Sequence, residues 1–400
     1  MELWADLPKQ GEQSDDSTEL STRLRRRLSE REMLQLWREW LLSDYVPTYG
    51  RSLGASRIFR RFYWVDALGI SQVKRSQATL RSQTLHSIEE IAQNLTREER
   101  PIALSGLLLE AGSSRRKELS PEQSSALSMP KKSGILAASW LEISSTLLAG
   151  MAQSPAIFLL NPLGIKLFSA DDLTAVVQRA VPTELFLLLP HKQIEYYLQL
   201  ARKNPQSASL ITNLLRSDRW KTLPQDKIEQ QISGFIQLFK HTLQRHFQLP
   251  LQVISLPVPN GPASLEPLPQ TLLFATRRTD SLFALNDALC RYQRERQKQS
   301  YEGVLGEEWF QAQAQSSLAS QHNELAQRIH QQGQAQRIRR WPDLRLQLIQ
   351  QHFGSFTLAE YDAILQELLL KQSIHCIWQK KSSQPDKERI PGNNDTLMWN

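Results

Sequence analysis

Two apolar strands that follow each other without a helix between them constrain the fold of this chain more than any other feature. The segments LQVISLPVP (residues 251–259) and QTLLFATRR (residues 270–278) are separated only by a loop rich in proline and glycine. Parallel neighbours need a crossover of a dozen or more residues, whereas antiparallel strands can join through a short loop. The sequence therefore predicts that these two strands pair antiparallel.

Upstream of this pair, apolar strands alternate with helices. Strands are predicted at residues 62–69 (FYWVDALG), 102–112, 156–161 and 183–190. Three helices are predicted between and after them: one at 135–151, one that begins after the capping pattern of Ser169 with Asp172, and one at 225–247. Such alternation predicts a parallel sheet covered by helices on both faces. We expect an α/β fold: a doubly wound, mostly parallel sheet of seven strands with a terminal antiparallel hairpin, with the tips after Val65 and Leu160 side by side. This architecture resembles the methyltransferase-like Rossmann fold of S-adenosylmethionine-dependent methyltransferases.

Composition divides the chain into five parts. Residues 1–20 are polar and are predicted to be a disordered tail. Residues 21–300 are predicted to form the methyltransferase-like Rossmann domain, whose N-terminal helix buries Trp37 and Trp40, places Arg38 on the opposite polar face and ends at Pro47 and Gly50. Residues 301–340, rich in glutamine, are predicted to be a helical linker. Residues 341–382 are predicted to form a winged-helix-like α+β module with two clear helices, the second capped by Thr357 and Glu360, and a final strand, and residues 383–400 a disordered tail.

Charge and cysteine content limit the class of function. The chain of 400 residues has a formal charge of +7 and two cysteines, too few for a disulfide framework or a cysteine metal site. No apolar run approaches the roughly 20 residues that cross a bilayer, and the acidic start is unlike a signal peptide, so we expect a cytoplasmic protein with no metal and no membrane contact. Clustered positive charge favours DNA or RNA as a partner. The candidate nucleic-acid-binding residues are Arg25, Arg26, Arg27, Arg60, Arg61, Arg337, Arg339, Arg340, Arg345, Lys380 and Lys381.

Candidate chemistry lies where strands end, because ligands of open α/β sheets bind beyond the carboxyl ends of the strands. The loop after the first strand offers Asp66 and a single glycine, Gly69, and the second strand closes on Glu110, an acid placed to bind ribose hydroxyls. Asn161-Pro162-Leu163-Gly164 follows the strand at 156–161, where amino-methyltransferases carry an Asn-Pro-Pro-aromatic motif that grips the target amine. Asn161 and Pro162 are the catalytic candidates if the protein is an enzyme, and Asp66, Gly69, Glu110 and Gly164 are the cofactor-binding candidates. The same tetrapeptide is also typical of a plain turn.

Other catalytic schemes are excluded by spacing. Gly106 and Gly112 are too far apart for a phosphate-binding loop, and serines stand where its Lys-Ser/Thr would be. His241 and His246 are five residues apart and lack the intervening glutamate of a zinc hydrolase.

The order of these motifs is similar to that of the three-Cys-motif partner family (TcmP). FYWVDALG, FLLNPLGIKLFSADDL, TELFLLL, a long helix and QTLLFATRRTDSLFALNDAL follow one another over roughly residues 35–380. The resemblance implies a methyltransferase-like Rossmann domain, a winged-helix-like end and a radical-SAM-like partner protein with a three-cysteine motif, often in mobile or phage-related gene neighbourhoods. It places Asp66 at the family's first-loop acid, and Asn161 at its fourth-loop acid.

This sequence departs from the family at the cofactor loop. Leu68, Ile70 and Gln72 replace most of its glycine-rich residues, and Leu163 replaces a phenylalanine. We therefore expect a degenerate partner subunit that binds no cofactor and works near nucleic acid. Two alternatives stay open: an active S-adenosylmethionine-dependent methyltransferase that modifies a nucleic-acid amine, and a purely structural scaffold.

Overall fold

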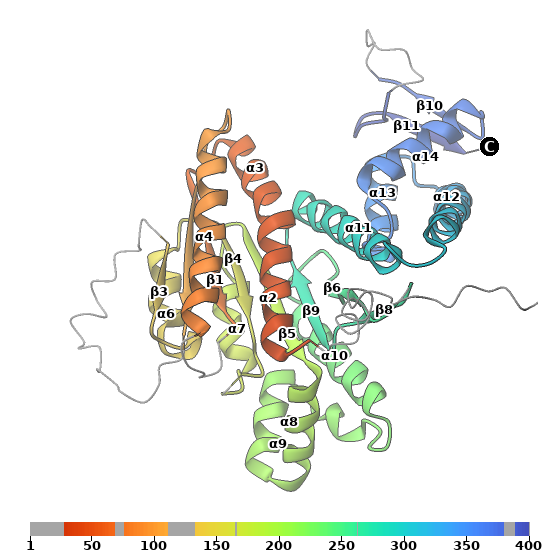
Figure 1. Ribbon diagram of the computed structural model, residues 1–400. Helices are drawn as coiled ribbons and strands as arrows, with labels where there is room; N and C mark the ends of the chain where they lie inside the picture. Colours follow the sequence, from red (N-terminus) through yellow and green to blue (C-terminus); the bar gives the residue numbers. More distant parts are fainter. Residues whose placement is uncertain are drawn as a thin grey trace, which may run out of the picture.

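The computed structural model describes residues 28–68, 76–110, 133–164, 166–261, 263–379 and 389–399. Its centre is a seven-stranded sheet in the order β3-β2-β1-β4-β5-β9-β6 (Figure 1). Strands β1 to β5 run parallel to one another, and β9 runs antiparallel to both β5 and β6. The predicted α/β class, with a mostly parallel sheet and an antiparallel last pair, is confirmed. The strands are β1 (Arg61–Ala67), β2 (Ala103–Leu109), β3 (Gly134–Leu136), β4 (Ala156–Leu160), β5 (Thr183–Pro190), β6 (Gln252–Ile254) and β9 (Gln270–Ala275).

The third strand lies where the sequence predicts the start of a helix. β3 pairs with the end of β2, and helix α6 (Trp140–Gly150) begins only after a capping box formed by Ser139 and Glu142. A strand of three residues is too short for an alternating pattern to be visible in the sequence. The predicted helix at 135–151 is therefore corrected to a strand followed by a helix.

Strands β1 and β4 are neighbours in the sheet. Val65 lies opposite Phe158 and Ala67 opposite Leu160, so the carboxyl ends of the two strands are side by side, as predicted. Residues that follow these strands share one edge of the sheet, the carboxyl edge.

Helices cover both faces of the sheet. Along β5, Leu185, Leu187 and Leu189 belong to one buried core while Phe186 and Leu188 belong to the other, as the two-residue period of a strand requires. The first core is covered by α6, α7 (Ala170–Val177), α8 (His191–Lys203), α9 (Pro205–Leu215) and α10 (Ile228–Gln244), with the 3₁₀ turn η2 (Arg219–Thr222). The second is covered by α2 (Glu30–Trp40), α3 (Val46–Ser56), α4 (Ser76–Arg97) and α11 (Thr279–Tyr301).

The N-terminal helix does not end at Pro47, which corrects the sequence prediction. Helix α2 continues through a π-helical turn, η1 (Leu41–Tyr45), into α3, and the Val46 N–H donates to the Leu41 carbonyl five residues earlier. Proline clashes with the carbonyl of the residue four positions before it in a regular helix. The wider π turn comes just before Pro47 and makes room for the proline ring, so the chain stays helical to Ser56.

The C-terminal unit consists of three helices and a two-stranded hairpin. These are α12 (Glu307–Gln336), α13 (Trp341–Gln351), α14 (Leu358–Leu370), β10 (Ile374–Ile377) and β11 (Thr396–Trp399). Leu325 and Ile329 of α12 share a buried core with α13 and α14, so this half of the predicted linker belongs to the unit. The predicted tail contains β11, which pairs antiparallel with β10. Both segments are too polar for their few core positions to stand out in the sequence.

Gly333 explains how the last strand reaches this core. A Cβ at Gly333 would lie 2.1 Å from the ring of Trp399, so only glycine lets the indole pack against α12. The Trp399 Nε1–H then donates to the Ile338 carbonyl at 2.7 Å. Along the chain, β6 and β9 are connected by a separate small hairpin, in which β7 (Pro257–Pro259) pairs with β8 (Leu265–Pro267).

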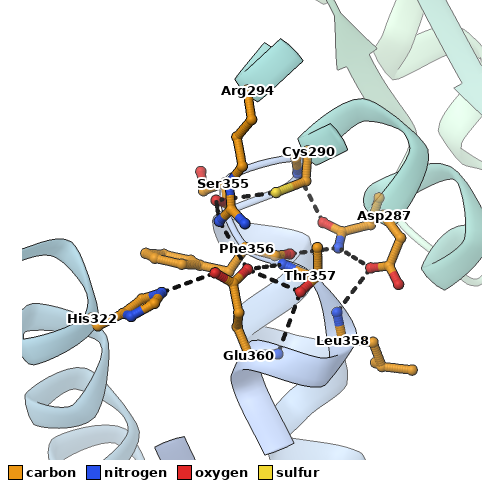
Figure 2. Close-up of polar contacts among 11 residues, drawn as sticks. Asp287, Cys290, Arg294, His322, Ser355, Phe356, Thr357, Leu358 and Glu360 are labelled. Carbon is orange, nitrogen blue, oxygen red and sulfur yellow. Dashed lines mark hydrogen bonds and ion pairs between the residues drawn. The ribbon is translucent and has the colours of Figure 1, made fainter. Parts of the chain in front are cut away.

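A polar contact joins the C-terminal unit to α11 (Figure 2). The fully buried Asn286 donates to the Phe356 carbonyl at 2.7 Å and accepts from the Gly354 N–H at 2.8 Å. Glu360, at the start of α14, pairs with Arg294 of α11 at 2.8 Å and with His322 of α12 at 3.0 Å. The loop between α13 and α14 is thereby held against the helix that follows β9.

Candidate functional site

Asp66, the predicted cofactor contact at the end of β1, is paired within the protein. Its side chain is buried, and Arg38 of α2 donates from Nε to Oδ2 at 2.6 Å and from Nη2 to Oδ1 at 3.2 Å. The Leu68 N–H donates to Oδ1 as well, at 3.1 Å. Both carboxylate oxygens are thus bound by donors of this chain, and Leu68 itself is buried.

Arg38 reaches Asp66 because α2 lies across the carboxyl edge of the sheet. Trp37, the residue before Arg38, donates from its indole N–H to Gln270 at the start of β9, at 2.9 Å. Two adjacent residues of one helix thus bind opposite parts of this edge. Arg38 is only 5% exposed, which corrects its predicted place on the polar face of the helix. An arginine beside a tryptophan carries no sequence signal of this role, so sequence reasoning missed it.

Asn161 takes part in a turn. Its Oδ1 accepts from the Leu163 N–H at 2.9 Å, and its Nδ2 donates to Gln193 of α8 at 3.1 Å. An asparagine that binds the backbone two residues ahead is an Asx turn. Leu163 is buried in the first core, where it occupies the loop interior.

The rest of the tetrapeptide is fixed in the same way. The Pro162 carbonyl accepts from the Phe168 N–H at 2.9 Å, and the Gly164 carbonyl accepts from the Tyr197 hydroxyl at 2.7 Å. A Cβ at Gly164 would come only to 3.5 Å from the nearest atom, so this position does not require glycine for space. The Asn161 side-chain oxygen and the Pro162 carbonyl, which would bind a target amine in a methyltransferase, instead accept hydrogen bonds that hold the loop.

The structure brings the ends of β1 and β4 together but separates the two candidate side chains. Asp66 binds α2, which covers the second core, whereas Asn161 binds α8, which covers the first. Each side chain therefore serves a different face of the sheet. Glu110 follows β2 and is half-buried, and its N–H donates to the Leu136 carbonyl at 2.9 Å. Gly69 lies outside the described residues.

The predicted basic residues lie in separate places. Arg60 and Arg61 lie at the start of β1, and Arg337, Arg339 and Arg340 are exposed before α13. Arg345 is held by Asp362 through two contacts of 2.6 and 2.8 Å, and only 15% of its side chain is exposed, so it stabilises the C-terminal unit. Arg25, Arg26, Arg27, Lys380 and Lys381 lie outside the described residues.

A buried acid at the opposite edge was not predicted. Glu184 of β5 is fully buried, and the Ser281 hydroxyl donates to it at 2.9 Å. Burial raises the pKa of Glu184 to about 7, against the lowering effect of hydrogen bonds from Thr276 and Ser281. Glutamate within the apolar run TELFLLLP is the signal in the sequence that could have revealed it.

Comparison of the chain with protein-family models, with curated proteins and with solved structures found no match. Within the described part of the chain, no helix combines the length and the apolar character needed to span a membrane. The same residues contain no group of three or more His, Cys, Asp or Glu side chains placed to hold a metal ion.

Proposed function

We propose that this protein is a TcmP-like partner subunit: a degenerate methyltransferase-like Rossmann scaffold that acts with a radical-SAM-like three-cysteine-motif protein near nucleic acid. The observation that carries the proposal is the buried pair of Arg38 with Asp66. A cofactor that used this acid would have to displace a guanidinium bound through two nitrogens. Breaking a buried ion pair by removing one partner typically costs about 3–5 kcal/mol. We place the protein in the cytoplasm and assign it no cofactor.

The strand order supports the methyltransferase-like part of this proposal. β9 is inserted antiparallel between β5 and β6, and the two halves of the sheet diverge from the neighbouring strands β1 and β4. Ligands of such sheets bind at the point where the strand order reverses. Arg38, Asp66 and Asn161 occupy that point here, each bound to other residues of the protein. The active methyltransferase is the weaker alternative, because Asn161 and Asp66, which it would need to bind the amine and the cofactor, are both bound to other residues of the protein.

The element order of the C-terminal unit supports a winged-helix-like module. Three helices followed by a β-hairpin are the elements of such a module, and α12 supplies the third helix. Helix α14, in the position of a recognition helix, contains no lysine or arginine and exposes Ala363, Glu367 and Leu370. This surface is suited to a protein partner better than to phosphates.

An exposed apolar corner provides a second surface for that partner. Leu305, in the turn between α11 and α12, is 99% exposed, and Trp309, in the first turn of α12, is 61% exposed. Large apolar side chains exposed in one short segment are typical of an interaction site. Glu302 and Glu308 are exposed in the same segment, so we assign to this corner an apolar segment of the partner that also carries lysine or arginine.

Two assays test the proposal. A methyl-transfer assay with labelled S-adenosylmethionine and mixed DNA and RNA should show no transfer by the protein alone. Co-expression with a three-cysteine-motif protein should give a complex, which Leu305→Ser with Trp309→Ser should weaken, while Tyr196→Ser, which removes a similarly exposed aromatic ring of α8, should leave it intact. Methyl transfer that depends on Asn161 would contradict the proposal.

A further inference from the structure

Six arginines gather where β1 and β2 begin, at the edge of the sheet opposite Asp66. The ends of α3 and α4 meet there: Arg100 donates to the Ala55 carbonyl at 3.2 Å, and the Ala103 N–H donates to the Arg60 carbonyl at 3.0 Å. Arg51 of α3 lies 3.6 Å from Glu98, just after α4. We call this group the arginine surface: Arg51, Arg57, Arg60, Arg61, Arg97 and Arg100.

The positive charge of this surface is only partly compensated. Glu98 and Glu99 are the acids in its connecting segment, and five of the six arginines are exposed, Arg61 being half-buried. Among the residues that the structure describes, no acid is within ion-pair distance of Arg57, Arg60, Arg61 or Arg97. Exposed arginines without acidic partners are free to bind an anion from solution.

Helix ends explain part of the cluster but not all of it. Arg57 and Arg97 stand at the C-terminal ends of α3 and α4, where the partial negative charge of a helix stabilises a cation. Arg60 directly precedes β1 and Arg61 begins it, so neither gains such stabilisation. Guanidinium groups bind phosphate through two parallel hydrogen bonds, which makes arginine the residue suited to phosphate recognition.

We infer that the arginine surface binds the phosphate backbone of the nucleic acid near which the protein acts; this inference rests on the proposed function. The contacts are independent of base sequence, because phosphate contacts position a protein without reading bases. Ile58, 75% exposed between Arg57 and Arg60, adds apolar contact with sugars or bases. In the C-terminal unit Arg345 is held by Asp362 and Lys371 by Glu367, whereas Arg337, Arg339 and Arg340 are exposed and form the competing site.

Fluorescence anisotropy with a short DNA duplex, a DNA single strand and an RNA strand tests this inference across a salt series. The triple variant Arg57→Gln/Arg60→Gln/Arg97→Gln should bind duplex DNA on the order of 100-fold more weakly at about 0.1 M salt, with a salt slope smaller by about 3. The matched control Lys192→Gln/Lys203→Gln/Arg219→Gln removes the same charge from exposed positions elsewhere and should bind within about threefold of the unmodified protein. Circular dichroism and melting temperature establish that each variant is folded.

Two results would overturn the inference, and they are distinguishable. If the triple variant binds like the unmodified protein while Arg337→Gln/Arg339→Gln/Arg340→Gln loses binding, the nucleic acid is bound before α13 and the proposed function stands. If the unmodified protein shows no salt-dependent binding to any of the three probes, the inference and the nucleic-acid part of the proposed function both fail. The three probes also tell DNA from RNA as the preferred partner.

Discussion

Arg38 of the N-terminal helix and Asp66 at the end of the first strand form a buried ion pair through two hydrogen bonds. The two residues are 28 positions apart in the chain, and their pairing attaches α2 to the carboxyl edge of the sheet. Asp66, which the sequence suggests as a cofactor contact, is therefore a buried structural residue.

Replacing Arg38 should therefore destabilise the fold. Arg38→Met leaves the Asp66 carboxylate buried without its cation, and we expect a loss of about 3–5 kcal/mol in the free energy of unfolding. Arg51→Met is the matched control: its pair with Glu98 is exposed and should contribute at most about 1 kcal/mol. Urea denaturation of the two variants measures the difference. Equal, small effects would show that the Arg38 pair does not hold the helix in place.

Asn161 should prove structural rather than catalytic. Asn161→Ala removes the acceptor for the Leu163 N–H and the donor to Gln193, and we expect a loss of about 1–3 kcal/mol. Asn213→Ala, at an exposed helical position, should change stability by less than about 0.5 kcal/mol. Thermal melting and a methylation assay check this together. An Asn161 variant that loses methylation while its melting temperature stays unchanged would refute the structural role.

Stability should fall as the pH rises through the titration of Glu184. Its pKa is about 7 in the folded protein against an ordinary 4.5, so the folded state binds more protons between these values and loses stability as the pH increases. Above about pH 7 the loss is complete and amounts to roughly 3 kcal/mol. Glu184→Gln should remove this part of the pH dependence, so that the stability of the variant relative to the unmodified protein rises from pH 4.5 to 7. Urea denaturation measures the free energy of unfolding of both proteins across this pH range. A difference between them that does not change with pH would contradict the assignment.

The contact between α11 and the C-terminal unit should depend on Asn286. Asn286→Ala leaves the Gly354 N–H and the Phe356 carbonyl buried without their partner, at a cost of about 2 kcal/mol or more. Asn323→Ala, exposed on α12, is the control and should have little effect. Limited proteolysis of the loop between α13 and α14 should become faster in the first variant only. Unchanged cleavage of both variants would mean that other contacts hold the unit.

The sheet could be predicted from the sequence because its strands are continuous apolar runs. AIFLL in β4 and TELFLLLP in β5 are buried on both faces and show no competing helical period. Capping patterns located helix starts as well: Ser169 with Asp172 and Thr357 with Glu360 both form capping boxes. These signals depend on neighbours in the chain, which a sequence displays directly.

The state of the candidate site could not be predicted, because it depends on contacts between distant residues. Arg38 occupies a polar position of its helix by spacing, and only the sheet edge beside it makes that position buried. β11 likewise became a strand through pairing with β10, and Leu325 of α12 became a core residue by packing against α13 and α14. None of these partners is close in sequence.

Isothermal titration calorimetry with S-adenosylmethionine tests most directly whether the first-strand acid is closed to a cofactor. The unmodified protein, with Arg38 bound to Asp66, is expected to give no binding heat at any concentration up to the solubility limit of the protein. Saturable binding with micromolar affinity that is lost in Asp66→Asn would show that Asp66 binds the cofactor, and would favour an active methyltransferase instead.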